Sequence, residues 1–322
     1  MDILRAPLQG RRLSRRSFLQ SSAAVLGSAL LPAFAKATAG EPVLAFAQNA
    51  RITTTDLGGA WLFQGAGGNV VALPGPEGAL LVDGGRAANA EALLAAVRTA
   101  TGASRIHTLI NTHWHPDQTG ANDAVGRAGG VIVAHEKTKL LLSNTVYNAI
   151  GIKERVAALP AAARPAKTVR LNGSIEFPGQ QIDYGYMPAA HTDGDVYVHI
   201  PKLNLLVVGG VLSAEEWPLL DYKNGAWFGG RVRAAEALAD LVRPDTRVVP
   251  AVGRMMTGKE VVRQRDIYQK LFTTMIGYLN KGFGPEDAAR ENPLKEYEKE
   301  FGDATQFEYD ALRSMMIAYV PD

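Results

Sequence analysis

The sequence predicts an α/β protein whose two halves each run from strands to helices and pack sheet against sheet, with the helices outside. Short β runs broken by glycine precede an Ala- and Leu-rich helix, and the same order returns later in the chain. Two histidines and a carboxylate follow directly after a buried strand. Loops at the carboxyl ends of strands are where α/β proteins carry their functional residues.

Composition narrows the class of protein. The chain has 322 residues, enough for one large domain or two small ones, and its hydrophobic fraction of 47% is that of an ordinary globular protein. A net charge of +2 gives no reason to expect a nucleic-acid partner. The chain has no cysteine, which excludes disulfides and thiolate metal sites, so any zinc ligands must come from His and Asp.

Residues 1–35 are predicted to be a twin-arginine signal peptide. Arg15 and Arg16 provide the arginine pair, residues 23–31 form an apolar run, and residues 33–35 offer a small-x-small cleavage site. The run is shorter than the ~20 residues of a membrane span. We therefore expect the twin-arginine machinery to export a periplasmic protein with no stable membrane span in its mature form. The alternative is a basic tail beside a hydrophobic helix.

The remaining elements follow in order. Residues 36–50 read as a linker, and a domain is predicted over 51–258, with a helical extension over 259–322 packed on it. Residues 157–166, rich in Ala and Pro, are expected to be a surface excursion. The predicted strands are 52–55, 60–63, 69–73, 79–82, 105–110, 131–134, 168–171, 174–177, 182–187, 196–200, 203–208 and 247–249. The predicted helices are 87–101, 120–127, 136–147, 231–242, 259–279, 285–291 and 307–319.

His113 and His115 are the strongest candidates for a functional site. In an extended segment, side chains two residues apart point the same way, so both imidazoles can face one ion. Imidazole suits zinc. Asp117 lies two residues further on, and it could act in the site or cap the helix that follows. The alternative for the pair is two loop histidines with local hydrogen bonds.

This stretch resembles the metal-binding loop of the metallo-β-lactamase fold superfamily, whose pattern is His-x-His-x-Asp-His. Asp83 in Leu-Val-Asp-Gly-Gly is similar to the family's early Asp-Gly element. His191, in residues 188–195, is similar to its next histidine. The resemblance implies a four-layer αββα sandwich, with His191 as the third metal ligand.

The chain departs from the family pattern at three positions. Gln118 replaces a histidine, Gly210 replaces the metal-bridging aspartate, and Val252 replaces the last histidine. Of the second metal's ligands only Asp117 remains. The resemblance therefore implies one zinc ion in the three-histidine site and a degraded second site.

These residues suggest a mononuclear zinc hydrolase. Zinc held by His113, His115 and His191 would lower the pKa of its water to ~7 and provide hydroxide to attack an ester-, lactone- or amide-like small molecule. Asp117 would orient that water or act as general base. Arg254 could reach the second pocket and pair with Asp117, or it could point to solvent.

Two other functions stay open at this point. Loss of family ligands would also suit a catalytically inactive binding protein that has lost its metal centre. A β-lactamase is a third possibility, although nothing in the chain points to lactam recognition. His107 and His199 are assigned structural roles, and His135, which opens a helix, has no partners at ligand spacing. A long loop over 213–230 could line a cleft or partner surface, or its aromatic residues could simply pack: Trp217, Tyr222, Trp227 and Phe228.

Overall fold

The structure is a computed structural model that describes residues 51–148 and 154–319. The predicted signal peptide and the linker up to residue 50 lie outside the described residues. Within the described part of the chain, no helix combines the length and the apolar character needed to cross a membrane.

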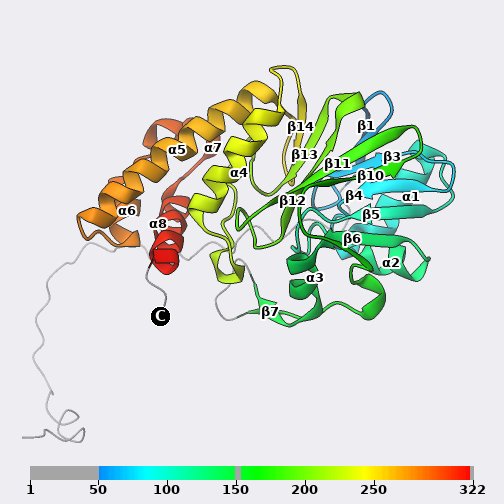
Figure 1. Ribbon diagram of the computed structural model, residues 1–322, viewed down its shortest axis with the longest axis horizontal. Helices are drawn as coiled ribbons and strands as arrows, with labels where there is room; N and C mark the ends of the chain where they lie inside the picture. Colours follow the sequence, from blue (N-terminus) through cyan, green and yellow to red (C-terminus); the bar gives the residue numbers. More distant parts are fainter. Residues whose placement is uncertain (1–50, 149–153, 320–322) are drawn as a thin grey trace, which may run out of the picture. The chain divides into compact units, whose positions relative to one another are not determined.

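The first sheet has seven strands in the order β1-β2-β3-β4-β5-β6-β9 (Figure 1). An antiparallel meander of β1 to β4 is followed by the parallel strands β5, β6 and β9, which line up beside β4. The strands are β1 (Thr53–Asp56), β2 (Trp61–Gln64), β3 (Val70–Leu73), β4 (Ala79–Val82), β5 (Ile106–Ile110), β6 (Val131–His135) and β9 (Lys167–Val169).

The second sheet has six strands in the order β10-β11-β12-β13-β14-β15, and only the β13–β14 pair is parallel. Its strands are β10 (Gly173–Phe177), β11 (Gln180–Met187), β12 (Asp195–Ile200), β13 (Leu205–Gly209), β14 (Arg247–Pro250) and β15 (Met256–Thr257). A separate small hairpin pairs β7 (Val146–Tyr147) with β8 (Arg155–Val156).

The α-helices begin and end near the predicted residues. They are α1 (Ala90–Thr101), α2 (Asn122–Arg127), α3 (Glu136–Ser143), α4 (Phe228–Leu241), α5 (Gly258–Asn280), α6 (Pro285–Glu291), α7 (Glu298–Phe301) and α8 (Thr305–Tyr319). Gly102 ends α1 with a φ of 68°, a conformation that costs other residues more. The 3₁₀ turns are η1 (Ala87–Asn89), η2 (Ala161–Ala163), η3 (Pro201–Leu203), η4 (Tyr222–Asn224) and η5 (Lys295–Tyr297).

Three hydrophobic cores separate four layers, which confirms the predicted αββα sandwich. Strand β4 shows how the layers form, because side chains along a strand alternate between its two faces. Ala79 and Leu81 join the core beneath α1 and α2, whereas Leu80 and Val82 join the core between the sheets. In β13, Leu206 likewise faces the third core, where α4 covers the second sheet and α5 lies outside α4 (Figure 1).

The short elements β7, β8, β15 and α7 were not predicted, and two further departures affect packing. The helix predicted to run to residue 147 ends at Ser143, because Asn144 adopts an extended conformation and β7 follows. The segment over 157–166 is not simply a surface excursion. Ala163 is 1% exposed, and a Cβ on Gly126 of α2 would lie 1.7 Å from the Ala162 carbonyl oxygen. Small residues on both sides let this segment approach α2 closely.

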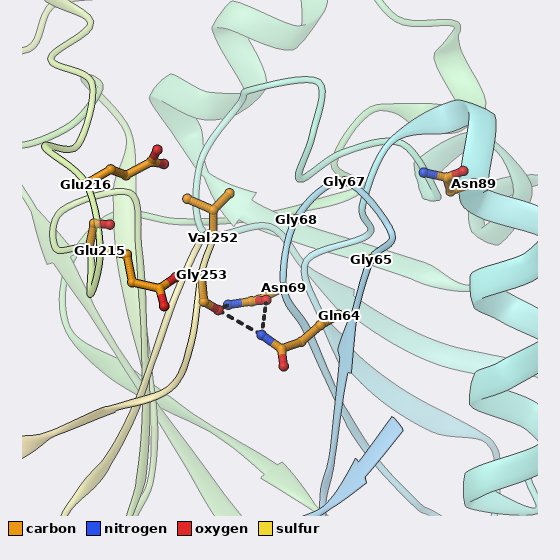
Figure 2. A pocket seen from close by; sticks show the side chains of 11 residues that line it. Gln64, Gly65, Gly67, Gly68, Asn69, Asn89, Glu215, Glu216, Val252 and Gly253 are labelled. Carbon is orange, nitrogen blue, oxygen red and sulfur yellow. Dashed lines mark hydrogen bonds between the residues drawn. The ribbon is translucent and has the colours of Figure 1, made fainter. Parts of the chain in front are cut away.

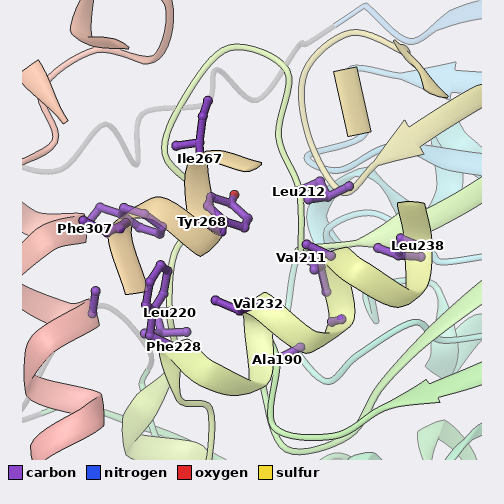
Figure 3. Close-up of a cluster of buried hydrophobic side chains, with 14 of the residues drawn as sticks. Ala190, Val211, Leu212, Leu220, Phe228, Val232, Leu238, Ile267, Tyr268 and Phe307 are labelled. Atoms are coloured by element: carbon purple, nitrogen blue, oxygen red, sulfur yellow. The ribbon is translucent and has the colours of Figure 1, made fainter. Parts of the chain in front are cut away.

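The C-terminal helices share the third core with α4 (Figure 3). Phe228 at the start of α4 contacts Tyr268 of α5 and Phe307 of α8, with ring centroids 6.0 and 5.7 Å apart. Trp217 stacks on Phe307, with centroids 5.2 Å apart. Packing therefore accounts for Phe228, whereas Trp217 packs on Phe307 and also lines a surface cavity of about 370 Å³ with it. Each such buried ring contributes roughly 1.5–3 kcal/mol.

Glu308 of α8 makes the stability of the fold depend on pH. Its side chain is fully buried, one oxygen accepts from the Leu294 N–H, and the other has no partner among the described residues. Burial raises the pKa of Glu308 from 4.5 to about 7. As pH rises, Glu308 therefore loses its proton in the unfolded chain before it does so in the folded protein. The free energy of unfolding falls as a result between about pH 4.5 and 7.

We expect Glu308→Gln to stabilise the metal-free protein at pH 8, on the order of 2 kcal/mol, and to have little effect near pH 5. Denaturant unfolding at both pH values, with a chelator present, measures the difference. Glu176→Gln on the exposed face of β10 is the matched control. A difference between Glu308→Gln and the parent that does not change with pH would contradict the assignment.

Candidate metal centre

The loops at one edge of the sandwich bring the candidate residues together. His113 and His115 follow the carboxyl end of β5, and His191 follows the end of β11. The turn at His191 is held by Asp195, whose carboxylate accepts from the backbone N–H groups of His191 at 2.7 Å and Thr192 at 2.8 Å. Strand ends thus position the candidate ligands, as predicted for the histidine loop.

The three imidazoles lie together and are buried. His113, His115 and His191 are 1%, 6% and 5% exposed, and their available ligand atoms lie within 4.8 Å of one another. The ring centroids are 4.7–4.8 Å apart and the ring planes cross at 83–88°. Three nearly perpendicular rings can direct one nitrogen each at a common point. The cluster could therefore hold a metal ion.

Asp83 fixes the orientation of His113 through Thr112. The Thr112 hydroxyl donates to Asp83 Oδ2 at 2.8 Å, so it accepts from Nδ1 of His113, which lies 2.9 Å away. The Thr112 N–H donates to the other carboxylate oxygen. Burial raises the pKa of Asp83 to about 8, although the two hydrogen bonds from Thr112 act to lower it. This contact leaves Nε2 of His113 free to bind a metal.

Asp221 fixes the orientation of His115. Its Oδ2 lies 3.1 Å from Nε2 of His115 and also accepts from Nε1 of Trp114 at 3.1 Å. Asn224 donates to both oxygens of the same carboxylate. Nε2 of His115 therefore carries the proton, and Nδ1 has the free lone pair.

Leu219 and Arg231 fix the orientation of His191. Nδ1 of His191 donates to the Leu219 carbonyl oxygen at 2.7 Å, and that oxygen also accepts from Arg231. Arg231 is fully buried, and its other terminal nitrogen donates to the Pro218 carbonyl oxygen at 2.6 Å. Because Nδ1 carries a proton, Nε2 of His191 has the free lone pair.

The free lone pairs meet in the middle of the cluster. Nε2 of His191 lies 3.0 Å from Nδ1 of His115, and neither nitrogen has a proton to donate in these tautomers. Two facing lone pairs repel unless a cation or a proton lies between them. Burial lowers the pKa of His113 and of His191 well below its ordinary value, which favours the neutral form that a metal requires. The donor set therefore fits a zinc ion.

The His115 ring differs from the other two in its electrostatics. Burial lowers the pKa of His115, but the hydrogen bond and the negative charge of Asp221 outweigh burial and raise it overall. This ring is therefore the one that most readily holds the bridging proton when no cation is bound.

A family profile described as the metallo-beta-lactamase superfamily matches residues 64–254, more than half of the chain. The chain belongs to the metallo-beta-lactamase superfamily. This confirms the family that the histidine loop and its neighbouring motifs resembled. A search of curated protein sequences found no significant match.

Many solved structures share the superfamily fold with this chain. A metallo-beta-lactamase from Pontibacter korlensis is 23% identical with a TM-score of 0.54, covering 68% of this chain and 99% of that one. The DIM-1 metallo-beta-lactamase is 18% identical with a TM-score of 0.54, covering 68% and 97%. A double mutant of the sec-alkyl sulfatase PisA1 is 16% identical with a TM-score of 0.62, covering 84% of this chain and 50% of that one.

The three positions expected to depart from the family pattern have different surroundings. Gln118 is fully buried and its amide nitrogen is 3.5 Å from the Ala251 carbonyl oxygen, while Val252 lines a neighbouring cavity. A Cβ built on Gly210 would lie 2.3 Å from Nε2 of His191. Any side chain at position 210 would therefore displace the His191 ring from its present place.

Arg254 does not pair with Asp117. Its guanidinium donates to Glu260 at 2.7 Å and to the Met255 carbonyl oxygen, on an exposed part of the surface. The alternative that Arg254 points to solvent is therefore the correct one. Asp117 is half-buried two residues after His115, and its negative charge contributes to raising the pKa of that histidine.

Sequence reasoning missed Asp221 and Arg231. Asp221 lies 106 residues from His115, in a loop without a repeating pattern, so nothing in the sequence pointed to it. Arg231 did carry a signal. It lies on the same side of α4 as Phe228, Ala235 and Leu238, all buried, at helical spacing. A charged residue on an apolar stripe indicates a buried polar contact.

We expect Asp221→Asn to weaken zinc binding about 10- to 100-fold. His115, Trp114 and Asn224 all donate to this carboxylate, and an amide offers one oxygen in place of two, so one donor would face an NH₂ group. Competition with a chromophoric chelator measures the affinity. Asp123→Asn, which removes an exposed ion pair with Arg127, is the control. Equal affinities in both variants would rule out this role.

Proposed function

We propose that the protein is a periplasmic hydrolase of ester-, lactone- or amide-like small molecules that uses one zinc ion. The observation that carries the proposal is the convergence of three free imidazole lone pairs in a buried cluster, each fixed by an oxygen behind it. His113, His115 and His191 would hold the ion. When bound, zinc lowers the pKa of a coordinated water to about 7 and polarises the bond under attack.

The residues of this chain would then have separate tasks. Asp83, Asp221 and the Leu219 carbonyl keep the three rings aimed at one point, so little reorganisation accompanies binding. Asp117, which Arg254 does not pair with, would orient the attacking water, and a carboxylate oxygen would accept its proton. Buried Trp114 packs against His115, with ring centroids 4.8 Å apart, and donates to the same Asp221 carboxylate.

A single ion is proposed because the second set of ligands has been replaced. Gln118 turns its amide nitrogen toward the Ala251 carbonyl oxygen, and Gly210 and Val252 have no donor side chain. Asp117 alone would hold a second ion weakly against its hydration. Export by the twin-arginine route, which carries folded proteins, would be compatible with a metal loaded before secretion.

Metal analysis and a substrate panel test the proposal together. Metal-free mature protein is titrated with zinc and assayed on neutral esters, lactones, nitrocefin and a secondary alkyl sulfate, the last because one similar structure is a sec-alkyl sulfatase. We expect one zinc per chain and ester or lactone turnover that a chelator abolishes. Two ions per chain would contradict the single-ion centre. Absence of zinc binding would favour the inactive binding protein.

A further inference from the structure

A cavity of about 350 Å³ lies between the loops that carry Gly68, Glu215 and Val252 (Figure 2). Its walls are the β2–β3 turn, the loop after β13 and the loop after β14, including Gly68, Glu215 and Val252. A Cβ on Gly68 would lie 2.6 Å from the Asp117 carbonyl oxygen, so the cavity wall touches the segment that follows His115. The volume suits a small organic group. An occupant would therefore lie beside the segment that carries Asp117, two residues after His115.

The charge of this cavity is negative. Glu215 and Glu216 line it, and none of its described lining residues is Lys, Arg or His. Neither glutamate forms a salt bridge within residues 51–148 and 154–319. The guanidinium of Arg254 bonds Glu260, and it lies close enough to Glu215 for the two charges to attract. Burial, together with the charge of Glu215, raises the pKa of Glu216. Two neighbouring carboxylates in a partly enclosed space favour a cation there.

Ser213 adds an unused hydrogen-bonding group to the same wall. Its side chain is 1% exposed, and its hydroxyl has no hydrogen-bond partner among the described residues. Gln264 holds the Ser213 backbone through its carbonyl oxygen and N–H, so the hydroxyl is not needed to keep the loop in place. A buried hydroxyl without a partner costs stability, and a ligand N–H would remove that cost.

Two of the three amide side chains of the wall, Gln64 and Asn69, are already engaged, whereas the amide of Asn89 has no hydrogen bond within the described residues. Nε2 of Gln64 and Nδ2 of Asn69 both donate to the Gly253 carbonyl oxygen, at 2.8 and 2.9 Å (Figure 2). What the side chains offer an occupant is therefore mainly acceptors, namely two carboxylates and a hydroxyl. A group with several N–H donors and a positive charge matches this wall, whereas a carboxylate or sulfate would be repelled.

We propose that this cavity binds a primary ammonium group of the substrate, while the bond to be hydrolysed lies at the histidine cluster. The inference rests on the proposed function and narrows its substrate class to cationic esters and amides. Glu215 and Glu216 act as specificity residues, and Ser213 accepts one ammonium N–H. An anionic substrate would lack any complementary charge in the described wall.

Two isosteric substrates test the inference by turnover. Zinc-loaded protein is assayed on 4-nitrophenyl trans-4-(aminomethyl)cyclohexanecarboxylate, whose trans ring keeps the amine from attacking its own ester, and on the trans-4-ethyl analogue, in which a methyl group replaces the ammonium. We expect kcat/KM to favour the cationic ester at least about tenfold, and the ratio to fall close to one in the double variant Glu215→Gln/Glu216→Gln. Glu91→Gln, in a separate surface hollow beside α1, is the control and keeps the preference. A ratio near one in the parent protein would overturn the inference.

A binding measurement separates failure of this inference from failure of the proposed function. Metal-free protein is titrated with dansylcadaverine, which carries an ammonium group, and with N-butyl dansylamide, which does not. Tighter binding of dansylcadaverine, lost about tenfold in the double variant, supports the ammonium site even when no ester is hydrolysed. Equal binding of the two probes overturns it, even if neutral esters are turned over.

Discussion

Replacing His191 with alanine is expected to lower zinc-dependent ester hydrolysis at least about a thousandfold and to abolish tight zinc binding. Two imidazoles would remain, and a zinc ion held by only two nitrogens exchanges readily with solvent. The substitution also removes the side chain against which Gly210 packs. Metal content after gel filtration and kcat/KM on the most responsive ester measure both effects.

The matched control is His107→Ala. His107 lies in β5, six residues before His113, and its ring contacts Thr108 and Glu77 on a half-exposed surface. That variant should keep one zinc ion and near-parental activity. If His191→Ala retained full activity with its zinc, the histidine cluster would not be the site of hydrolysis.

Replacing Arg231 with methionine is expected to destabilise the metal-free protein by about 2–4 kcal/mol and to weaken zinc binding about 10- to 100-fold. Arg231 is fully buried and donates to the carbonyl oxygens of Pro218 and Leu219. Methionine fills similar space but leaves both oxygens without these donors. The Leu219 carbonyl, which orients His191, would then lose its anchor.

Denaturant unfolding of metal-free protein measures the stability change, and chelator competition measures zinc affinity. Arg233→Met is the control, since Arg233 lies two residues along the same helix with its side chain exposed over Trp227. It should change neither quantity by more than a small amount. A variant at Arg231 that loses stability but binds zinc as tightly as the parent would limit the role of Arg231 to folding.

Much of the fold could be predicted because its signals are local. The alternation in β4 and β13 and the glycine that ends α1 are physical requirements of the elements themselves. The segment over 157–166 was harder to predict. Its burial depends on the absence of a side chain at Gly126, which belongs to a different helix.

In the candidate site, too, some residues could be predicted from local patterns and others could not. His113 and His115 lie two residues apart in one loop, so their shared direction follows from backbone geometry. The residues that orient them depend on tertiary contacts. Asp221 bonds His115, which lies 106 residues away in the sequence. Arg254 bonds Glu260, a neighbour on the surface, and not Asp117. Side chains on irregular loops find partners that no periodic pattern encodes.

The contacts of Arg231 mean that the superfamily segment of this protein depends on residues outside that segment. Phe307 of α8 lies against its guanidinium, with 5.7 Å between the guanidinium carbon and the ring centroid, and the Ser314 hydroxyl accepts the Phe228 N–H that begins α4. A chain shortened to the part that it shares with the lactamase structures would lose the contacts of Phe307 and Ser314. Helix α8 thus supports an imidazole that lies more than a hundred positions upstream, and the superfamily segment without α8 should bind metal poorly.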